Sequence, residues 1–317
     1  MPTFTWDIDP ILLHFPPWLR WLPIDGIRYY SLLYVGVFLG GYKLLDWQIR
    51  RAGGEPEDAN DFVLYGIIAV LGGARVGHVF FYEWDRFSSD PLWLFKIHEG
   101  GLASHGATVG LFLAMFVFTR FRRQSFIEGC DRFAFSAALG AILVRIGNFF
   151  NSEIVGRVTG GGWGVRFPRY DRVTDPPLRH PSQLYEVALG LAVMAALVFA
   201  DRALGKEKRP RGVMISLFLA LYFTGRFIVE YFKEYQPGET AAGLTTGQWL
   251  SLLPAALGYA GVWLSFAKRV PARWNVYRMP LSAADDGDDG DDDGRGDDDV
   301  DEVLLDRSAS RRSSKER

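Results

Sequence analysis

Charged side chains stand inside stretches of the chain that are otherwise apolar. Arg145 lies within residues 133–150, and Arg226 and Glu230 lie four residues apart within residues 213–232. A charge inside a membrane is costly, so such residues face a water-filled cavity or a partner of opposite charge. A structural ion pair is the alternative for Arg226 and Glu230, because residues four apart are neighbours on a helix.

Polar residues that could complete a site occur near these charges. His105 stands in the glycine-rich run Gly100–Ala107, where it is either a site residue or a hydrogen-bonded packing residue. Arg75 and His78 are spaced to share one helix face, and structural and functional roles are equally open for both. The polar run that begins at Arg145 continues through Asn148, Asn151, Ser152 and Glu153.

Five arginines are concentrated in one polar stretch, residues 151–182. They are Arg157, Arg166, Arg169, Arg172 and Arg179. Guanidinium groups suit phosphate recognition, so this stretch could bind the phosphate of a lipid. The alternative is ordinary salt bridging within the loop, for which Glu153 and Asp171 are available.

Seven apolar stretches approach the length of about 20 residues that a helix needs to cross a bilayer. They cover residues 29–47, 61–82, 103–119, 133–150, 184–200, 213–232 and 247–267. We therefore expect an all-α fold, a polytopic membrane bundle of about seven transmembrane helices. The expected organisation is a periplasmic or interfacial segment over 1–28, a seven-helix transmembrane domain that carries the site over 29–267, and a cytoplasmic tail over 268–317.

Lysine and arginine in the short loops predict the orientation, because cytoplasmic loops are enriched in them. The basic loops follow the first, third, fifth and seventh stretches, and their first cations are Arg50, Arg120, Arg202 and Lys268. This alternation predicts an N-terminus outside and a C-terminus in the cytoplasm. The charged residues of 133–150 and 213–232 then fall toward the outer leaflet with His105, which one outward-opening polar cavity would explain.

The composition averages two unlike regions, which is why the mean hydropathy is only +0.03. Residues 285–302 hold eleven Asp, one Glu and one Arg, a net charge of −11. Such an Asp/Gly run cannot bury a core and is expected to be disordered. Since the whole chain carries −2 and the last fifteen residues +3, residues 1–284 carry +6. That mild excess suits anionic lipid, and no nucleic-acid partner is expected.

Other features of the sequence set limits on its chemistry. The single cysteine, Cys130, cannot form an intramolecular disulfide and is interpreted as an incidental thiol. The histidines are scattered, so no metal or other cofactor is expected. No cleavable signal peptide is predicted, because no basic segment precedes a short apolar core at the N-terminus. Tryptophans interleaved with proline and leucine instead suggest a segment at the membrane interface, and they are Trp6, Trp18 and Trp21.

The polar segments also carry a family resemblance. The run Arg145–Thr159, with the sequence RIGNFFNSEIVGRVT, resembles the signature of the prolipoprotein diacylglyceryl transferases. Further segments resemble the same family, in the same order, and they are Gly100–Gly106, Arg179–Glu186, Arg226–Glu230 and Gly247-Gln248. The resemblance covers about residues 25–267. The four ordered motifs that make it specific are Gly100–Gly106, Arg145–Thr159, Arg179–Glu186 and Arg226–Glu230. The departures from the family pattern are Ala107 and Val144 in place of glycine, and Tyr29-Tyr30-Ser31 in place of Trp-Tyr-Gly.

Members of this family transfer a diacylglyceryl group from phosphatidylglycerol to the lipobox cysteine of a preprolipoprotein, forming a thioether and releasing glycerol phosphate. The resemblance therefore implies a multi-pass transferase of the bacterial inner membrane that performs the first step of lipoprotein maturation. It also implies a seven-helix bundle with the N-terminus outside. The expected partners are phosphatidylglycerol, signal peptides with a lipobox cysteine, and membrane lipid. The chemistry requires a thiolate nucleophile and stabilisation of the departing phosphate.

The resemblance also implies roles for individual catalytic residues. Arg145 and Arg226 are expected to grip the phosphate. His105 is expected to accept the thiol proton, since an ordinary imidazole titrates near neutral pH, or else to orient the head group. Glu230 is expected to position Arg226, and it competes with His105 as the base.

The remaining motif residues are expected to bind substrate. Tyr30 should help to hold the lipid, and Gly156 should permit a close backbone turn after residues 133–150. The residues expected to line the head-group pocket are Asn148, Asn151 and Glu153. The other expected substrate-binding residues are Arg157, Ser182, Gln183 and Tyr185.

Two other classes of function stay open at this point. A transporter also needs buried charges and an open cavity, but its polar residues would continue through the membrane, and no inverted repeat is visible. A catalytically silent homologue that only binds lipid or protein is the second alternative. The presence of every motif residue argues against it.

Overall fold

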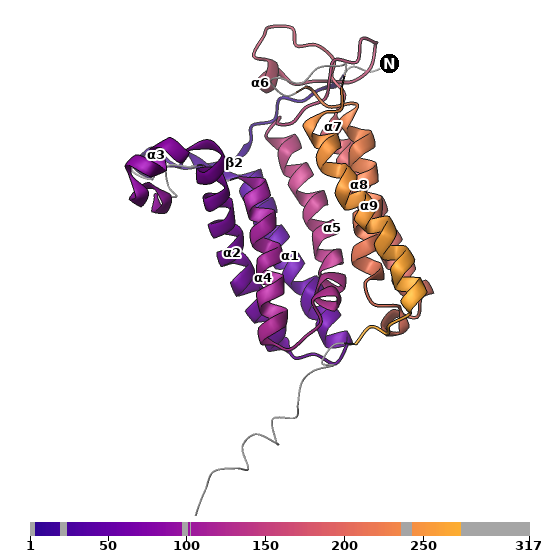
Figure 1. The fold of residues 1–317 in the computed structure, drawn as a ribbon. Coiled ribbons are helices and arrows are strands. Elements are labelled where there is room, and N and C mark those ends of the chain that lie inside the picture. The colour runs from indigo at the N-terminus through magenta and orange to yellow at the C-terminus, as the bar shows by residue number, and fades with distance from the viewer. Residues whose placement is uncertain (1–3, 20–23, 97–100, 102, 236–242, 274–317) are drawn as a thin grey trace, which may run out of the picture. The chain divides into compact units, whose positions relative to one another are not determined.

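The computed structural model describes residues 4–19, 24–96, 101, 103–235 and 243–273 (Figure 1), without the side chains of residues 19, 104 and 105. Residues Met1–Arg278 form one compact unit. The acidic run over 285–302, expected to be disordered, lies outside the described residues.

Seven long α-helices make up most of the described residues, and each corresponds to one of the predicted apolar stretches. They are α1 (Tyr29–Arg51), α2 (Pro56–Tyr82), α4 (Ser104–Phe121), α5 (Phe126–Phe150), α7 (Ser182–Ala203), α8 (Val213–Glu230) and α9 (Thr246–Lys268). Five of them are long and apolar enough to cross a membrane, namely α2, α5, α7, α8 and α9. The helical, multi-pass character is therefore confirmed, and the count of seven spans stays a prediction.

The short elements lie outside the long helices. They are α3 (Trp84–Ser89), α6 (Pro168–Asp171), the 3-10 turns η1 (Pro17–Leu19), η2 (Pro91–Phe95) and η4 (Lys206–Lys208), and the strands β1 (Phe4–Thr5), β2 (Ile11–His14), β3 (Gly26–Arg28) and β4 (Val165–Arg166). Strands β2 and β3 pair antiparallel, whereas β1 and β4 pair parallel, with Phe4 opposite Val165. The all-α prediction did not include these small sheets.

Helix α5 occupies the centre of the bundle. Figure 1 shows it between a group formed by α1, α2 and α4 and a group formed by α7, α8 and α9. Its buried contacts with α7 and α8 form an apolar cluster of Ala134, Phe135, Ala138, Val193, Leu197, Val213, Met214 and Phe218. A residue at either end of α5 can therefore reach several helices at once.

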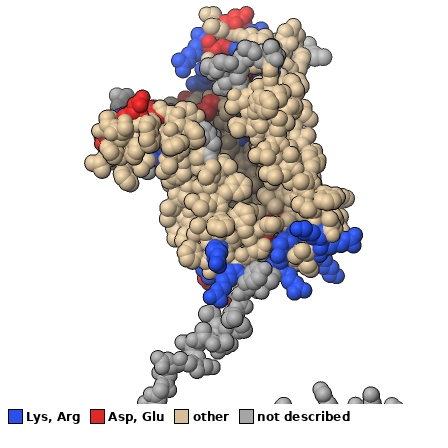
Figure 2. Space-filling model, in the orientation of Figure 1, with Lys and Arg blue, Asp and Glu red and all other residues tan. Residues whose placement is uncertain are grey.

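Glycine allows α2 and α4 to pack with their backbones in close contact. A Cβ added to Gly106 would lie 2.2 Å from the carbonyl oxygen of Gly73, and one added to Gly110 would lie 2.0 Å from that of Ala69. Such small-residue interfaces are typical of membrane helices, where close packing replaces the hydrophobic drive. Few charged side chains show on the flank of the bundle in Figure 2, and most of them gather at its ends.

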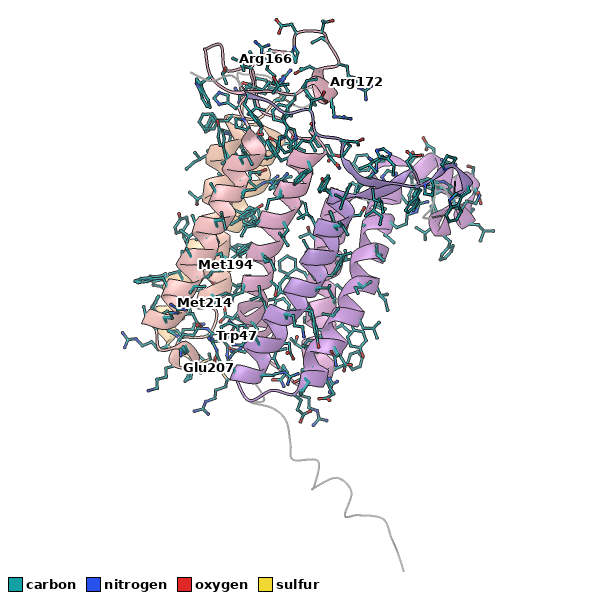
Figure 3. All side chains as sticks on the ribbon, turned by 180° about the vertical axis from the view of Figure 1, so that it is seen from behind. Trp47, Arg166, Arg172, Met194, Glu207 and Met214 are labelled. Atoms are coloured by element: carbon teal, nitrogen blue, oxygen red, sulfur yellow. The ribbon has the colours of Figure 1, made fainter. Side chains whose placement is uncertain are left out.

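One end of the bundle carries a polar head formed by residues 151–181 with the N-terminal strand β1. Arg166 and Arg172 lie in this head, whereas Glu207 lies at the opposite end (Figure 3). The ring of Trp6 packs on Phe149 at 4.2 Å between centroids, and the interfacial position of this segment stays a prediction. Trp18 is exposed, and Trp21 lies outside the described residues.

Arg75 has a structural role. It is 2% exposed, and its guanidinium donates hydrogen bonds to the carbonyl oxygens of Trp93 (2.6 Å) and Leu94 (2.9 Å). The same group stacks on the Trp93 ring at 4.2 Å. Arg75 therefore fixes the arm formed by α3 and η2 to α2, which favours the structural alternative for this residue.

Candidate functional site

Charged residues from separate parts of the chain meet at the head end of the bundle, around the carboxylate of Glu186. Its Oε2 lies 2.7 Å from Nε of Arg145. Its Oε1 lies 3.8 Å from Nη1 of Arg226 and 3.0 Å from Nζ of Lys233. Glu186 is only 1% exposed, so α5, α7, α8 and the segment after α8 converge on one buried carboxylate.

Glu230 also belongs to this group, but its ion-pair partner is not Arg226. Among the ion pairs of the described residues, its Oε2 is 3.0 Å from Nζ of Lys233, whereas Arg226 is paired with Glu186. The expected direct Arg226–Glu230 pair is therefore not formed. The carboxyl of Glu230 is packed on Gly247, where an added Cβ would lie 2.4 Å from Cδ. Arg145, Glu186, Arg226, Glu230 and Lys233 are called the Glu186 cluster below.

A chain of amide and carboxylate contacts extends the cluster along the end of α5. Nη1 of Arg145 donates to Oδ1 of Asn148 at 3.1 Å. Nδ2 of Asn148 donates to Glu153 at 3.2 Å, and Nδ2 of Asn151 donates to the other oxygen of Glu153 at 2.9 Å. The structure thus brings Asn148, Asn151 and Glu153 together with Arg145, as their places in the motif predicted.

The turn after α5 is strained, and buried side chains of α7 hold it. Ser152 and Ile154 both have left-handed φ values, of 54° and 53°, and a β-branched residue rarely adopts that conformation. Oγ of Ser182 donates to the carbonyl of Ile154 at 2.8 Å, and Nε2 of Gln183 donates to that of Glu153 at 2.7 Å. Ser182 and Gln183 are 0% exposed, so in this conformation they hold the turn and present no surface to a substrate.

Gly156 lies where three backbone segments meet. An added Cβ would lie 2.4 Å from the carbonyl oxygen of His180 and 2.6 Å from that of Phe232. The Gly156 amide donates to the same His180 carbonyl at 3.0 Å. A glycine is therefore required for close approach of neighbouring segments, and not for a turn directly after α5 as predicted.

Arg157 and Tyr185 support the segments around the cluster. Arg157 donates from Nε to the Lys233 carbonyl at 2.8 Å and from Nη1 to the Tyr235 hydroxyl at 2.6 Å. It therefore fixes the backbone that carries the Lys233 ammonium. The Tyr185 hydroxyl lies 3.1 Å from Nδ1 of His180. Burial, and then the nearby charge of Arg157, lower the pKa of His180.

Tyr30 reaches the same region from the first turn of α1. Its ring packs on Gly147 of α5, where an added Cβ would lie 2.3 Å from Cδ2. Its hydroxyl donates to that of Tyr34 at 3.3 Å and also interacts with Asn148. Tyr30 is thus placed beside the polar end of α5, as a lipid-holding role requires.

His105 stands in the first turn of α4, but its side chain lies outside the described residues. Its predicted role as a base or a head-group contact stays a prediction.

Most of the loop arginines form salt bridges within the head. Arg179 pairs with Asp171 at 2.6 Å, Arg166 with Asp175 at 2.6 Å, and Arg169 with Asp7 at 2.9 Å. This supports the salt-bridge alternative for these three arginines, with Asp171 as one acceptor. The other suggested acceptor, Glu153, bonds to the amides of Asn148 and Asn151.

Metal-binding clusters and reactive thiols are not visible in the part of the chain that the structure describes. No three or more His, Cys, Asp or Glu side chains there are close enough to share an ion. Cys130 is a buried free thiol at the other end of α5 from Arg145. The chemistry of the Glu186 cluster is therefore that of guanidinium, ammonium and carboxylate groups.

Glu186 and Lys233 are the site residues that the sequence did not single out. Glu186 closes the motif Arg179–Glu186, and Lys233 follows the motif Arg226–Glu230 by three residues. Spacing along the chain could have indicated both residues. Lys233 stands three residues after Glu230, and Glu186 stands four residues after Ser182. Only the packing of α5, α7 and α8 shows that one carboxylate serves cations from three segments.

Sequence comparison identifies relatives along most of the chain. The model of the family described as "Prolipoprotein diacylglyceryl transferase" matches residues 18–264. The phosphatidylglycerol–prolipoprotein diacylglyceryl transferase of Tolumonas auensis is 38% identical over 249 residues, which cover 78% of this chain and 92% of the relative. Proteins of the same name from Idiomarina loihiensis and Vibrio cholerae are 38% and 39% identical, over 79% and 80% of this chain and 91% and 89% of the relatives. The chain belongs to the prolipoprotein diacylglyceryl transferase family.

Proposed function

We propose that this chain transfers a diacylglyceryl group from phosphatidylglycerol to the cysteine thiol of a prolipoprotein. The observation that carries the proposal is the Glu186 cluster, in which two arginines from different helices share one buried carboxylate. The names of the relatives from three bacteria support the same activity. The recognised cysteine is that of a lipobox, the segment that ends the signal peptide.

Arg145 and Arg226 hold the phosphate of the lipid. Their side chains keep 13% and 24% of their surface exposed, whereas the carboxylate between them is buried. The ion-paired group has three cations for two carboxylates, so one positive charge is left for an anionic head group. In a water-poor site these guanidinium groups stabilise the charge that develops on the leaving phosphate.

The transfer is a displacement at the diacylglyceryl carbon that carries the phosphate. The thiolate sulfur forms a new bond to that carbon, and the bond from the carbon to the phosphate oxygen breaks. The electron pair of the broken bond stays on the oxygen, so glycerol phosphate leaves with one more negative charge. Arg145 and Arg226 face that added charge, which is where stabilisation lowers the barrier.

A base must accept the thiol proton before or during attack, because the thiolate is the nucleophile. His105 and Glu230 are the candidates. Glu230 is 7% exposed, packed on Gly247 and paired with Lys233, so its carboxylate is already engaged. We therefore assign proton acceptance to His105, with Glu230 as the alternative.

The proposed setting is the bacterial inner membrane, with seven spans, the N-terminus and the Glu186 cluster outside, and the C-terminus in the cytoplasm. The charge distribution of the loops supports this orientation. Reporter fusions at Gly205 and at Arg317 should read cytoplasmic, and a fusion at Arg169 should read periplasmic. A cytoplasmic signal at Arg169 would overturn both the topology and the outward site.

The direct test of the function uses the purified full-length protein with phosphatidylglycerol and a peptide that contains a lipobox cysteine. The expected products are a thioether-linked diacylglyceryl peptide, detected by mass spectrometry, and free glycerol phosphate in equal amount. A peptide with serine in place of the cysteine is the matched control. Lipid binding without either product would favour a silent homologue, and anion flux through liposomes containing the protein would favour a transporter.

A further inference from the structure

A cavity opens at the end of the bundle opposite the Glu186 cluster. It measures about 300 Å³ and lies between the start of α5, the start of α8 and the end of α9. The 18 residues of α8 separate the two ends, which is about 27 Å at 1.5 Å per residue. The polar side chains that line it are Ser125, Arg211, Ser216, Ser265 and Lys268. This pocket is called the base cavity.

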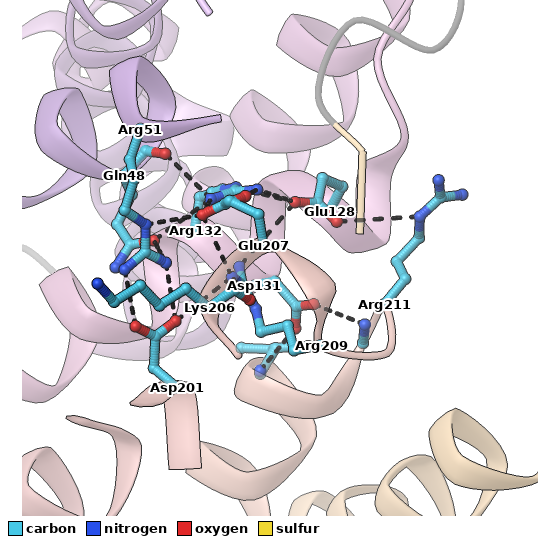
Figure 4. A network of polar contacts seen from close by, with 12 residues as sticks. Gln48, Arg51, Glu128, Asp131, Arg132, Asp201, Lys206, Glu207, Arg209 and Arg211 are labelled. Atoms are coloured by element: carbon cyan, nitrogen blue, oxygen red, sulfur yellow. Dashed lines mark hydrogen bonds and ion pairs between the residues drawn. The ribbon is translucent and has the colours of Figure 1, made fainter. Parts of the chain in front are cut away.

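The guanidinium of Arg211 is only partly neutralised. Its nearest carboxylate oxygen is Oε2 of Glu128, 3.9 Å from Nε, which is too far for a hydrogen bond. The other oxygen of Glu128 is held by Arg132 at 2.8 Å. Nε of Arg211 is buried and has no hydrogen-bond acceptor among the described residues. Figure 4 shows this guanidinium at the edge of the polar network, joined to Glu128.

The other polar groups of the base cavity suit an anion. Lys268 is exposed and ends α9. Ser125 stands at the N-cap of α5, yet within the described residues its hydroxyl makes no capping hydrogen bond. Ser216 presents a second hydroxyl to the cavity. Two cations and serine hydroxyls in one lining suit the oxygens of a phosphate group.

Apolar side chains surround the cavity on the flank of the bundle. Ile127 is 50% exposed, Leu264 41% and Val270 43%, and Ile127, Leu264 and Val270 line the cavity itself. Exposed apolar walls beside a cationic pocket fit a molecule with a phosphate head and hydrocarbon chains better than a free phosphate ion.

We propose that the base cavity binds the phosphate of an anionic phospholipid, separately from the lipid that reacts at the Glu186 cluster. The acyl chains lie along the apolar surface of α5 and α9, while Arg211 and Lys268 contact the phosphate. Basic side chains gather around this end of the molecule (Figure 2), which favours an anionic over a neutral lipid.

The test is a titration of the purified full-length protein with phosphatidic acid, followed by native mass spectrometry. Lys268→Glu and Arg211→Gln should each weaken binding of one phosphatidic acid about tenfold, because each removes a cation at the phosphate. Lys208→Glu is the matched control: it makes the same charge change on an exposed side chain at the same end, outside the cavity lining, and should change binding less than about twofold. Arg226→Gln should leave this binding in place.

Four results would overturn the proposal. Equal weakening by Lys208→Glu and Lys268→Glu would indicate general surface attraction. Equal binding of phosphatidylcholine would show that the phosphate is not recognised in an anionic lipid. Displacement of the lipid by an equal concentration of inorganic phosphate would indicate a free-anion site. Loss of all binding in Arg226→Gln would assign the bound lipid to the Glu186 cluster. Lys268 is exposed, so its variant carries the test if Arg211→Gln fails to fold.

Discussion

Both ends of the bundle hold arginines and carboxylates, but the two groups are built differently. The base network, at the end away from the Glu186 cluster, consists of Gln48, Arg51, Glu128, Asp131, Arg132, Asp201, Glu207 and Arg209 (Figure 4). Arg132 is 0% exposed and donates to Glu128 at 2.8 Å, to Glu207 at 2.9 Å and to the Gln48 carbonyl at 3.0 Å. In the Glu186 cluster the arginine side chains stay 13% and 24% exposed.

The contacts of the base network show that its charged groups are paired with partners inside the protein. Arg51 pairs with Asp201 and with Glu207, both at 2.7 Å, and so ties α1 to α7 and η4. Asp131 accepts hydrogen bonds from the backbone amides of Gly212 (2.6 Å) and Ile215 (2.9 Å), and thereby caps α8. Arg51 and Asp131 thus join helices. A buried charge in a membrane helix therefore marks a site only where part of its surface and charge is left over.

Breaking the base network should have the largest effect on folding. Arg132→Gln removes the guanidinium that donates to both Glu128 and Glu207, and removing one member of a buried pair costs about 3–5 kcal/mol. We expect much less folded protein and a lower melting temperature in detergent. The molecules that do fold should keep normal turnover, because Arg132 lies far from the Glu186 cluster. A stable but inactive Arg132→Gln protein would contradict the division between the two ends.

Breaking the Glu186 cluster should have the opposite result. Arg145→Gln or Arg226→Gln should lower turnover by about 10²–10³-fold, because each removes a group that stabilises the leaving phosphate. Folding should change less than in Arg132→Gln, because Lys233 still pairs with the buried carboxylate of Glu186 at 3.0 Å. Arg166→Gln, in a salt bridge of the head, is the control and should keep activity. Near-normal turnover in both cluster variants would remove the phosphate clamp.

A substitution at His105 tests whether the end that carries the Glu186 cluster also supplies the general base for the thiol proton. His105→Gln keeps hydrogen bonding but cannot accept a proton, so thioether formation should fall about a hundredfold while phosphatidylglycerol binding persists. Raising the pH should partly restore the rate, because a cysteine thiol with a pKa of about 8.5 then ionises without help. The measurement is binding and turnover against pH for both proteins. Unimpaired turnover at neutral pH would exclude His105 as the base and move that role to Glu230.

A substitution at Glu186 tests whether its charge is needed to align the arginines of the cluster. Glu186→Gln keeps the shape but loses the carboxylate that aligns Arg145 and Arg226, so kcat should fall about tenfold through poorer alignment. Glu234→Gln, which removes an exposed partner of Arg179, is the matched control and should stay within about twofold. If Glu186 only stabilised the fold, the melting temperature would fall and kcat per folded molecule would stay unchanged.

The sequence predicted the helices and the ends at which charges gather, because hydropathy and charge act along the chain. It placed Arg145, Asn148 and Glu153 correctly in one group, since they follow each other around the end of α5. Contacts between helices were less predictable. The expected Arg226–Glu230 pair is replaced by pairs to Glu186 and Lys233, which depend on how α7 packs on α8.

The role of buried polar residues was also beyond the sequence. Ser182 and Gln183 belong to a motif, but only the structure shows that they hold the strained turn at Ile154 and Glu153. The arginines of the base network stand in or near basic loops. In the sequence they indicate the orientation of the chain in the membrane, but not that they form a buried network. The sequence does not distinguish an arginine that is saturated, such as Arg132, from one that is accessible, such as Arg226.

Truncating the C-terminal tail after Pro280 should have the smallest effect, because the part removed is dominated by an Asp/Gly run. The first residues of the tail close on the bundle: the amide of Ala272 donates to the Arg209 carbonyl at 3.2 Å, and the amide of Arg211 donates to the Val270 carbonyl at 2.7 Å. The Asp/Gly composition of 285–302 cannot bury a core. Truncation after Pro280 should therefore change turnover by less than about twofold. It should shift the melting temperature by no more than about a few degrees. A well-folded truncated protein without turnover would show that catalysis at the Glu186 cluster needs the tail.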